Sequence, residues 1–365
     1  MATEASSVTR AVLALVRQAI ERSGGWLPFD RFMALVLYAP GLGYYANDSR
    51  KFGQLPSSGS DFVTAPEMSP LFGKALAVQV AEALRVTGTD EVWEFGAGSG
   101  ALALQLLQAL GRKVRRYTIV DLSGSLRARQ RKTLAAYTGQ VRWVGELPEG
   151  MHGVVVGNEV LDAMPVKLLA RIGGTWHERG VALAGADALA WEDRVTELRP
   201  PVDPEGSHDY VTEIHPQAEA FIRTLADRLV QGAAFFVDYG FPEREYYHPQ
   251  RHMGTLMCHR GHLADTDPLA DLGMKDITAH VNFTGVGVAA QDTNLAVLGY
   301  TTQARFLVNC GLAGMLAAAD LPGRVAGQRL MAEHEMGELF KVIALHRGDF
   351  WDAVGFREGD RTHTL

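Results

Sequence analysis

The sequence predicts a parallel α/β fold, in which short apolar strands alternate with helices through the middle of the chain. From residue 90 onwards, apolar runs of strand length are separated by stretches with a helical pattern, which is typical of a parallel sheet with right-handed crossovers. The expected strands are "EVWEF", "YTIVD", "VRWV", "GVVVGN" and "GAAFFVDYG". With 365 residues, the chain lies near the upper limit for a single core, so we expect one core with substantial additions.

These additions are predicted before, within and after the core. Residues 8–23 and 29–37 have helical patterns, and residues 40–66 are rich in Gly, Pro and Ser around Tyr44 and Tyr45, which predicts a lid. A glycine-paired turn between near-alternating residues predicts an antiparallel hairpin or meander in the first insertion. The expected organisation is a helical and lid segment at 1–74, a core at 75–347 with insertions at about 165–205 and 241–290, and a C-terminal tail at 348–365.

Composition and charge limit the classes of partner. The formal net charge is −7 and the isoelectric point is near 6.0, so nothing favours general binding to nucleic acid or to an anionic membrane. Cys258 and Cys310 are the only cysteines, which argues against a disulfide framework and fits a reducing cytoplasm. The N-terminal helical run contains charges and resembles neither a signal peptide nor a membrane span, so we expect a cytoplasmic protein without membrane insertion.

The stretch "EFGAGSG" places three glycines between an expected strand and an expected helix. Gly96, Gly98 and Gly100 would let the backbone turn sharply and approach a ligand, while the helix N-terminus offers amide donors. The dinucleotide fingerprint is G-x-G-x-x-G, whereas E-x-G-x-G-x-G, with Glu94 ahead of the glycines, is common in proteins that bind S-adenosylmethionine. That ligand carries an ammonium and a sulfonium, so a carboxylate nearby is useful. The alternative is that the glycines only allow close packing of strand and helix.

Polar residues also follow two later strands. Asp121 ends an expected strand about one βα unit after the glycines, where an acid can accept hydrogen bonds from both ribose hydroxyls. Another strand runs into Asn158, Glu159 and Asp162, at the sheet edge where doubly wound folds bind ligands. Paired acids there suit methyl transfer to nitrogen, since they can orient a cationic acceptor, and a hydride-transfer enzyme has no particular need for them.

Several longer stretches occur in a specific order between residues 37 and 307. They are "LYAPGLGYY", "DFVTAPEMSPLFG", "EFGAGSGALA", "GNEVLDAMPV", "EIHPQAEAFI", "FFVDYGFPEREYY", "GTLMCHRGHLADTDPL", "DITAHVNF" and "GYTTQARFL". In this series the chain resembles the MidA-type methyltransferases, the family of the mitochondrial complex I assembly factor. The first 25 residues, the 170–205 insertion and the segment after 347 match weakly.

The resemblance implies a class I methyltransferase core with a Rossmann-like seven-stranded sheet. The stretch "LFKVIALHR" would form the final, antiparallel strand of this sheet. It implies methyl transfer from S-adenosylmethionine, which leaves S-adenosylhomocysteine, to an arginine of a protein. The family's substrate is a core subunit of complex I, so protein arginine methylation and complex I assembly are the expected context. No nucleic acid is expected as a partner, and the oligomeric state is left open, with a homodimer as one option.

The expected site residues fall into three sets. For catalysis we predict Glu159 and Asp162, which would orient a guanidinium and take its proton late, with Glu67 closing from the lid; Glu67 could equally cap the following helix. The expected cofactor-binding residues are Glu94, Gly96, Ala97, Gly98, Gly100, Asp121, Leu122 and Asn158. The expected substrate-binding residues are Glu213, Asp238, Tyr239, His262, Asp276 and His280, although Glu213 could simply start a helix.

Three positions depart from the family pattern and bear on the substrate. Asn282 stands where the family usually has Asp, Lys275 where Gln is common, and Gly261 where a basic residue is frequent. The amide at Asn282 argues against a general base at that position.

Other chemistries are conceivable for this sequence. Four histidines and one cysteine crowd a single stretch, but their spacing matches no closed zinc pattern, so we expect no metal and interpret the histidines as lining a substrate groove. The members are His248, His252, Cys258, His259 and His262. Two other functions stay open: a nicotinamide-dinucleotide oxidoreductase that uses the same glycine turn, and a non-catalytic chaperone that binds the cofactor and holds a partner subunit.

Overall fold

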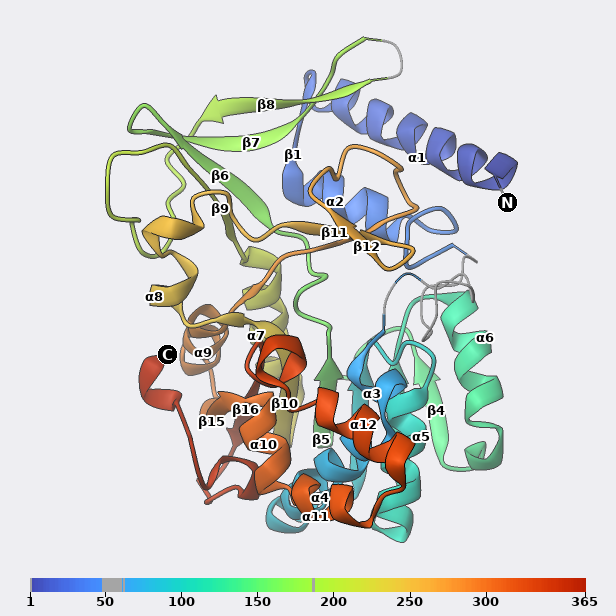
Figure 1. The fold of residues 1–365 in the computed structure, drawn as a ribbon. Coiled ribbons are helices and arrows are strands. Elements are labelled where there is room, and N and C mark those ends of the chain that lie inside the picture. The colour runs from blue at the N-terminus through green and yellow to red at the C-terminus, as the bar shows by residue number, and fades with distance from the viewer. Residues whose placement is uncertain (1, 48–60, 62, 186–187) are drawn as a thin grey trace. The chain divides into compact units, whose positions relative to one another are not determined.

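The computed structural model describes residues 2–47, 61, 63–185 and 188–365, and the chain forms two compact units (Figure 1). Unit 1 comprises Met1–Phe62, Asp162–Glu219 and Phe241–Asn282. Unit 2 comprises Val63–Leu161, Ala220–Gly240 and Phe283–Leu365. Residues 48–60 and 62, which carry much of the expected lid, lie outside the described residues, so the lid stays a prediction.

Unit 2 is built on a large sheet in which seven strands follow one another in the order β15-β16-β10-β5-β2-β3-β4. Their bounds are β2 (Glu91–Phe95), β3 (Arg116–Val120), β4 (Val141–Val144), β5 (Met151–Asn158), β10 (Leu229–Phe241), β15 (Ala296–Thr302) and β16 (Phe340–Arg347). The strands from β10 to β4 are parallel, whereas β16 is antiparallel to both β10 and β15. The predicted parallel α/β sheet with a final antiparallel strand is therefore confirmed.

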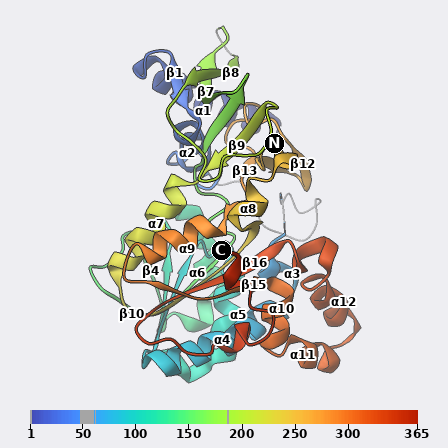
Figure 2. The ribbon, with the colours of Figure 1, turned by 90° about the vertical axis from the view of Figure 1, so that its left-hand side faces the viewer.

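Helices cover this sheet on both faces, as the alternation of apolar side chains requires. Val154 and Val156 of β5 join one core with residues of α4, α5, α10 and α11. On the opposite face, the ring of Phe221 in α7 packs edge-on against Phe95 and Phe236, with centroid separations of 5.1 and 5.8 Å. Figure 2 shows α7 and α9 on one side of the sheet and α4 and α11 on the other.

The helices of this unit are mostly short. Their bounds are α3 (Ala65–Met68), α4 (Pro70–Thr87), α5 (Ala101–Leu110), α6 (Gly124–Thr133), α7 (Pro216–Arg228, which begins in unit 1), α9 (Phe283–Gln291), α10 (Gln303–Asn309), α11 (Leu312–Ala318) and α12 (Leu321–Arg329). Single turns of other helix types are η2 (Gly111–Lys113), η3 (Ala135–Tyr137), η5 (Glu333–Gly337), η6 (Val354–Phe356) and η7 (Thr362–Thr364).

Unit 1 combines helices with two smaller sheets. One sheet has the order β1-β7-β6-β9, with β8 paired to β7, and the other has the order β12-β11-β13. The apolar faces of α1 and α2 pack with residues of β6 and β7 into one core, which includes Val16, Phe32, Leu168 and Val181. Strands β6, β7 and β8 form the antiparallel meander that the sequence predicts for the first insertion.

The elements of unit 1 have the following bounds. The helices are α1 (Ala2–Arg22), α2 (Phe29–Tyr38), α8 (Glu243–Tyr246) and the turn η4 (Pro249–Arg251). The strands are β1 (Trp26–Pro28), β6 (Lys167–Ile172), β7 (Thr175–Leu183), β8 (Leu189–Val195), β9 (Tyr210–Ile214), β11 (Met257–Arg260), β12 (Leu263–Asp265), β13 (Asp276–Thr278) and β14 (Val281–Asn282). Among the described residues, no helix has the length and apolar character needed to cross a membrane.

Residues 348–365, which the sequence sets apart as a tail, belong to unit 2 and are bonded to α4. Glu82 Oε2 accepts hydrogen bonds from the Val354 amide at 2.9 Å and from Trp351 Nε1 at 3.4 Å. Gln79 Oε1 accepts a third from the Gly355 amide at 2.7 Å. The C-terminal segment is therefore anchored by polar side chains of the helix that precedes β2.

We expect Glu82→Ala to release this anchor, because two donors of the C-terminal segment lose their acceptor. Loss of such bonds lowers stability by about 1 to 3 kcal/mol, which corresponds to amide exchange about five- to a hundredfold faster in the affected segment. Hydrogen exchange followed by mass spectrometry would measure this for residues 351–357. Glu333→Ala, at an exposed position, is the control; equal exchange in both variants would contradict the anchor.

Candidate functional site

The glycine turn of unit 2 adopts a backbone that other residues resist. Gly96, Gly98 and Gly100 follow β2 with φ of 62°, 51° and 85°, all in the left-handed region. A Cβ at Gly96 would also lie 2.9 Å from Val160 Cγ2. Gly100 is the N-cap of α5, so the turn leads directly into a helix N-terminus, as the sequence predicts.

Glu94 precedes this turn and is fully buried within β2. Its Oε2 accepts a hydrogen bond from Tyr117 Oη at 2.7 Å. Burial raises the pKa of Glu94 to about 8; the bond from Tyr117 acts against this shift, and the charge of Asp121 adds to it. A cation bound nearby would favour the ionised carboxylate.

Asp121, the residue after β3, is held by two donors. Its Oδ1 accepts from the Ser123 amide at 2.8 Å and its Oδ2 from Gln130 Nε2 at 2.7 Å. Gln130 Nε2 also donates to Gly98 O at 3.1 Å, and Gln130 Oε1 accepts from Trp143 Nε1 at 2.9 Å. Gln130 is buried, and it joins Asp121 to the glycine turn.

Sequence reasoning missed Gln130. The signal that the sequence offers is one amide side chain among the basic residues of α6, "GSLRARQRKT". The neighbouring Leu122 is 83% exposed, an unusual position for leucine and one that suits contact with the apolar face of a nucleobase. Ala97, within the turn, is buried.

The loop after β5 carries a strained acid. Glu159 has φ of 53°, which is unfavourable for a residue with a side chain, and its Oε1 accepts from Asn158 Nδ2 at 2.9 Å. Asp238 Oδ2 accepts from the amides of Val160 and Leu161 at 3.1 and 2.9 Å, and so fixes this loop. The structure therefore places Asp238 where it supports Glu159.

Asn158 leaves one acceptor unused. Its Oδ1 is buried and has no hydrogen-bond partner among the described residues. Buried oxygens of this kind are uncommon in folded proteins and indicate a missing donor. An ammonium or amine group of a ligand would supply it.

Glu67 is brought to the glycine turn, although it comes from a different helix. Its Oε1 accepts a hydrogen bond from Ser99 Oγ. Gln105 of α5 fixes this arrangement, because its Nε2 donates to Pro66 O at 2.8 Å. Unit 2 thus gathers Glu67 with the expected cofactor residues.

Unit 1 gathers a second group of expected residues around Asp276. Both Asp276 oxygens accept from Tyr45 Oη, at 2.8 and 2.9 Å. Burial raises the pKa of Asp276 to about 8, and the negative charge of Asp162 adds to the shift. The ring of Tyr38 stacks on Tyr45 at a centroid distance of 5.5 Å, and Tyr38 Oη donates to Ala163 O at 2.8 Å. Two buried acids and two tyrosines therefore share one part of unit 1.

Glu213 has a different environment, in which protein donors occupy both oxygens. Oε1 accepts from the amides of Thr255 and Leu256 at 2.8 and 3.0 Å, and Oε2 from Tyr246 Oη at 2.8 Å and Thr255 Oγ1 at 3.1 Å. These bonds join β9 to the segment before β11. They give Glu213 a structural role, and the structure shows no oxygen left for a substrate.

The remaining expected residues lie in separate surroundings. His262 is in the β11–β12 turn, with φ of 62°, and its amide donates to Asp61 O at 2.8 Å. The ring of His280 stacks on Phe241, with centroids 5.2 Å apart. In unit 2, Tyr239 packs edge-on against Phe340 at a centroid distance of 5.3 Å.

The structure also explains two departures from the family pattern. Lys275 Nζ pairs with Asp265 at 2.8 Å and donates to Asp267 O at 3.1 Å, so it closes the loop that leads to β13. The Asn282 side chain hydrogen bonds to Glu243 and Tyr247. A carboxylate at position 282 would repel Glu243, whereas an amide can donate to it. Among the described residues, no group of His, Cys, Asp or Glu is arranged to hold a metal ion.

Comparisons with known proteins agree with this geometry. The model of a family of S-adenosyl-L-methionine-dependent methyltransferases matches residues 75–301. The chain is 28% identical to the mitochondrial protein arginine methyltransferase NDUFAF7 of Mus musculus over 375 residues, which cover 89% of this chain and 82% of the relative. It is 26% identical to the homologue of Caenorhabditis elegans over 329 residues, which cover 80% of this chain and 74% of the relative.

Solved structures give a closer match. The chain superposes with a TM-score of 0.95 on a protein of Burkholderia thailandensis that was crystallised with S-adenosyl-homocysteine. The two are 50% identical, and the alignment covers 99% of this chain and 98% of the other. A native crystal structure from the same organism is 49% identical, with a TM-score of 0.90 and the same coverage.

The raised pKa of Glu94 predicts a pH dependence of stability. In the folded chain this carboxyl titrates near pH 8, whereas its pKa in the unfolded chain is about 4.3. The contribution of the protonated Glu94 carboxyl to the free energy of unfolding is therefore complete below about pH 4.3 and is lost as the pH rises through about 8. We expect the urea unfolding midpoint of Glu94→Gln to fall less steeply between pH 5 and 8 than that of the unmodified chain. Glu358→Gln, at an exposed position, is the control, and identical slopes in all three proteins would refute the buried titration.

Proposed function

We propose that this chain, which belongs to a family of S-adenosyl-L-methionine-dependent methyltransferases, transfers a methyl group to an arginine side chain of a protein. The observation that carries the proposal is the match to relatives named protein arginine methyltransferases over most of their length. Independent support comes from the buried and strained carboxylates of the candidate site, because a guanidinium is a cation with several N–H donors.

The residues of unit 2 fit the family's cofactor. Asp121 would accept hydrogen bonds from the ribose hydroxyls, and exposed Leu122 would contact the base. The unused Asn158 Oδ1 fits the amino group of the methionine part, and Glu94 would be ionised by the positive charge nearby. When bound, S-adenosylmethionine supplies a methyl group on a sulfonium, which is electrophilic.

The acceptor residues would work by orientation and by charge. Glu159 cannot turn freely, because Asn158 holds its carboxylate and Asp238 fixes its loop. Such a carboxylate can localise the charge of a guanidinium on one side and accept a proton as the new N–C bond forms. Asp162 and Asp276 are proposed as contacts of unit 1 for the protein substrate, with Tyr45 orienting Asp276. Glu67 is proposed as a contact at the glycine turn.

The partner and the location are part of the proposal. We propose a subunit of respiratory complex I as the protein substrate, on the basis of the family resemblance. A cytoplasmic location is proposed for this chain, whereas the names of its animal relatives place those proteins in mitochondria.

The assignment of Asp121 predicts a change in cofactor affinity. Asp121→Ala removes the charged acceptor of two hydrogen bonds that the ribose hydroxyls donate. Each bond contributes about 1.5 to 3 kcal/mol, so affinity for S-adenosylhomocysteine should fall at least about tenfold. Isothermal titration calorimetry measures this directly. The matched control is Asp292→Ala, an exposed acid of unit 2. Unchanged affinity in Asp121→Ala would remove the ribose assignment.

The assignment of Glu159 predicts a loss of methyl transfer without a loss of cofactor. Purified complex I subunit would be incubated with radiolabelled S-adenosylmethionine and the enzyme, and the labelled residue mapped by mass spectrometry. Glu159→Gln should lower the rate about a hundredfold or more, the usual contribution of a positioned base, while affinity for S-adenosylhomocysteine stays unchanged. Asp276→Asn is expected to act in the same direction.

Three outcomes would contradict this proposal in different ways. Methyl groups on lysine would refute arginine as the acceptor, and an undiminished rate in Glu159→Gln would refute the role of that carboxylate. Absence of labelled protein, also in a whole lysate, would favour a non-catalytic chaperone that binds the cofactor.

A further inference from the structure

One part of unit 2 is strongly basic, although the chain as a whole is acidic. Between Gly111 and Arg142 the sequence has nine basic residues and a single acid, Asp121, while the whole chain has 35 Lys and Arg against 42 Asp and Glu. The basic residues are Arg112, Lys113, Arg115, Arg116, Arg127, Arg129, Arg131, Lys132 and Arg142. The candidate site uses none of these side chains to bind the cofactor or the acceptor.

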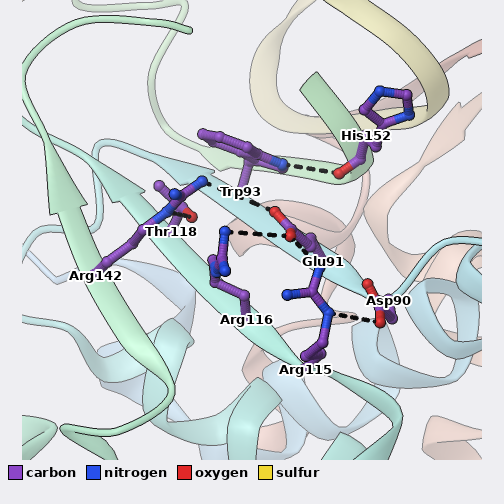
Figure 3. Close-up of polar contacts among 8 residues, drawn as sticks. All are labelled: Asp90, Glu91, Trp93, Arg115, Arg116, Thr118, Arg142 and His152. Carbon is purple, nitrogen blue, oxygen red and sulfur yellow. Dashed lines mark hydrogen bonds and ion pairs between the residues drawn. The ribbon is translucent and has the colours of Figure 1, made fainter. Parts of the chain in front are cut away.

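Three of the arginines converge on one carboxylate where β2 and β3 begin, as Figure 3 shows. Arg115 Nη2 lies 2.5 Å from Glu91 Oε1, Arg116 Nη1 lies 3.5 Å from the same oxygen, and Arg142 Nη2 lies 3.8 Å from Oε2. Arg115 Nε also pairs with Asp90 Oδ2 at 2.8 Å. Three guanidinium groups thus share two carboxylates, which leaves an excess of positive charge.

The guanidinium groups are held in place and remain accessible. Arg142 lies over the ring of Trp93, 5.0 Å from its centroid, and its Nε donates to Thr118 Oγ1 at 2.8 Å. Trp93 is fixed in turn, because its Nε1 donates to His152 O at 3.1 Å. The Arg142 side chain is still 42% exposed, and that of Arg115 is 55% exposed.

The topology explains why arginines cover this part of the sheet. β4 is an edge strand, and only six residues, 145–150, connect it to β5, with no helix among them. Crossovers between parallel strands usually contain a helix that covers the sheet face. Here Arg116 and Arg142 extend over the strands instead.

Further cations lie at the same edge of the sheet. Turn η2, with Arg112 and Lys113, immediately precedes β3. The last turn of α6, with Arg131 and Lys132, lies elsewhere, beside the glycine turn, because Gln130 Nε2 donates to Gly98 O at 3.1 Å and Thr133 Oγ1 donates to Ser99 O at 2.8 Å. Arg131 lies over Trp143, 5.1 Å from the ring centroid, and Trp143 Nε1 donates to Gln130, so this arginine lies near the cofactor residues. The glycine turn and Asp121 follow the ends of the same strands, so this basic edge is remote from the cofactor residues within unit 2.

We propose that this basic edge, defined by Arg112, Lys113, Arg115, Arg116 and Arg142, docks an acidic segment of the protein substrate. The proposal rests on the proposed function, because only a protein substrate needs a docking surface away from the reacting atoms. Guanidinium groups bind carboxylates in a planar, two-pronged geometry, and Glu91 already shows that these arginines accept one carboxylate. A short acidic segment fits better than a nucleic acid, because a long polyanion would also meet the negative charge of the rest of the chain.

The first test uses a fluorescent Glu-rich peptide as the probe, with binding to the full chain followed by anisotropy. The double variant Arg115→Gln/Arg116→Gln removes two charges and leaves Arg142 over Trp93. Exposed pairs contribute about 0.2 to 1 kcal/mol each, so the peptide should bind about two- to thirtyfold more weakly. Added salt should weaken binding to the unmodified chain.

The matched control is Arg357→Gln, since this arginine of unit 2 is also 55% exposed and lies outside the basic edge. Equal binding by the double variant and the control would overturn the proposal. Tighter binding of a single-stranded oligonucleotide than of the peptide, lost in the double variant, would also overturn it in favour of a nucleic acid. Calorimetry with S-adenosylhomocysteine shows whether the variant is folded, and its cofactor affinity should be unchanged.

A second measurement connects the basic edge to catalysis. With the complex I subunit as substrate, the double variant should raise KM and leave kcat unchanged, because docking energy is the same in the ground state and the transition state. A short arginine peptide without acidic residues should be methylated equally by both proteins. If the unmodified chain methylates no protein, the proposed function fails, while the peptide-binding experiment still decides whether the basic edge binds acidic segments.

Discussion

The candidate site depends on one constraint, the parallel register of β10, β5, β2 and β3. Because these neighbouring strands run in the same direction, their carboxyl ends meet at one edge of the sheet. The glycine turn follows β2 and Asp121 follows β3. β5 ends at Asn158 and is followed by Glu159, and Asp238 lies near the end of β10. Asp238 then fixes the loop after the adjacent strand, so the order of the strands also determines where Glu159 lies.

The buried acids of the two units differ in how many donors the protein gives them. Glu213 accepts four hydrogen bonds from the chain itself, which satisfies a carboxylate without any ligand. Glu94 accepts from Tyr117, and Asp276 accepts from Tyr45 and from the Ile277 amide; burial raises the pKa of each acid to about 8. An acid with few protein donors gains most from a bound cation, which is why Glu94 and Asp276 are better candidates for ligand contact than Glu213.

The sequence predicts the core better than it predicts the contacts around the site. The strands can be predicted from the spacing of apolar residues, and the glycine turn from the backbone conformations that glycine allows; both signals are local in the sequence. The role of Asp121 is predicted from its distance of about one βα unit from the glycines. Gln130 could not be found in this way, because its three partners are Asp121 after β3, Gly98 of the glycine turn and Trp143 of β4. The hydrogen bond between Tyr45 and Asp276 could not be predicted either, because these residues are far apart in the sequence. Each unit is assembled from three separate stretches of the chain, so such pairs meet only in the folded protein.

Charge is separated along the strands of unit 2, and this has a consequence for how a substrate would bind. Glu67, Glu94 and Glu159 lie at the carboxyl edge, whereas Arg115 and Arg142 lie where the strands begin. A strand of five residues such as β2 spans about 16 Å, which is longer than the screening length of about 8 Å at physiological salt. The two groups therefore act as separate local fields, one attracting cations and the other anions. A protein with an arginine on one segment and acids on another would be oriented by both, and the order of charges along it would decide which arginine is presented.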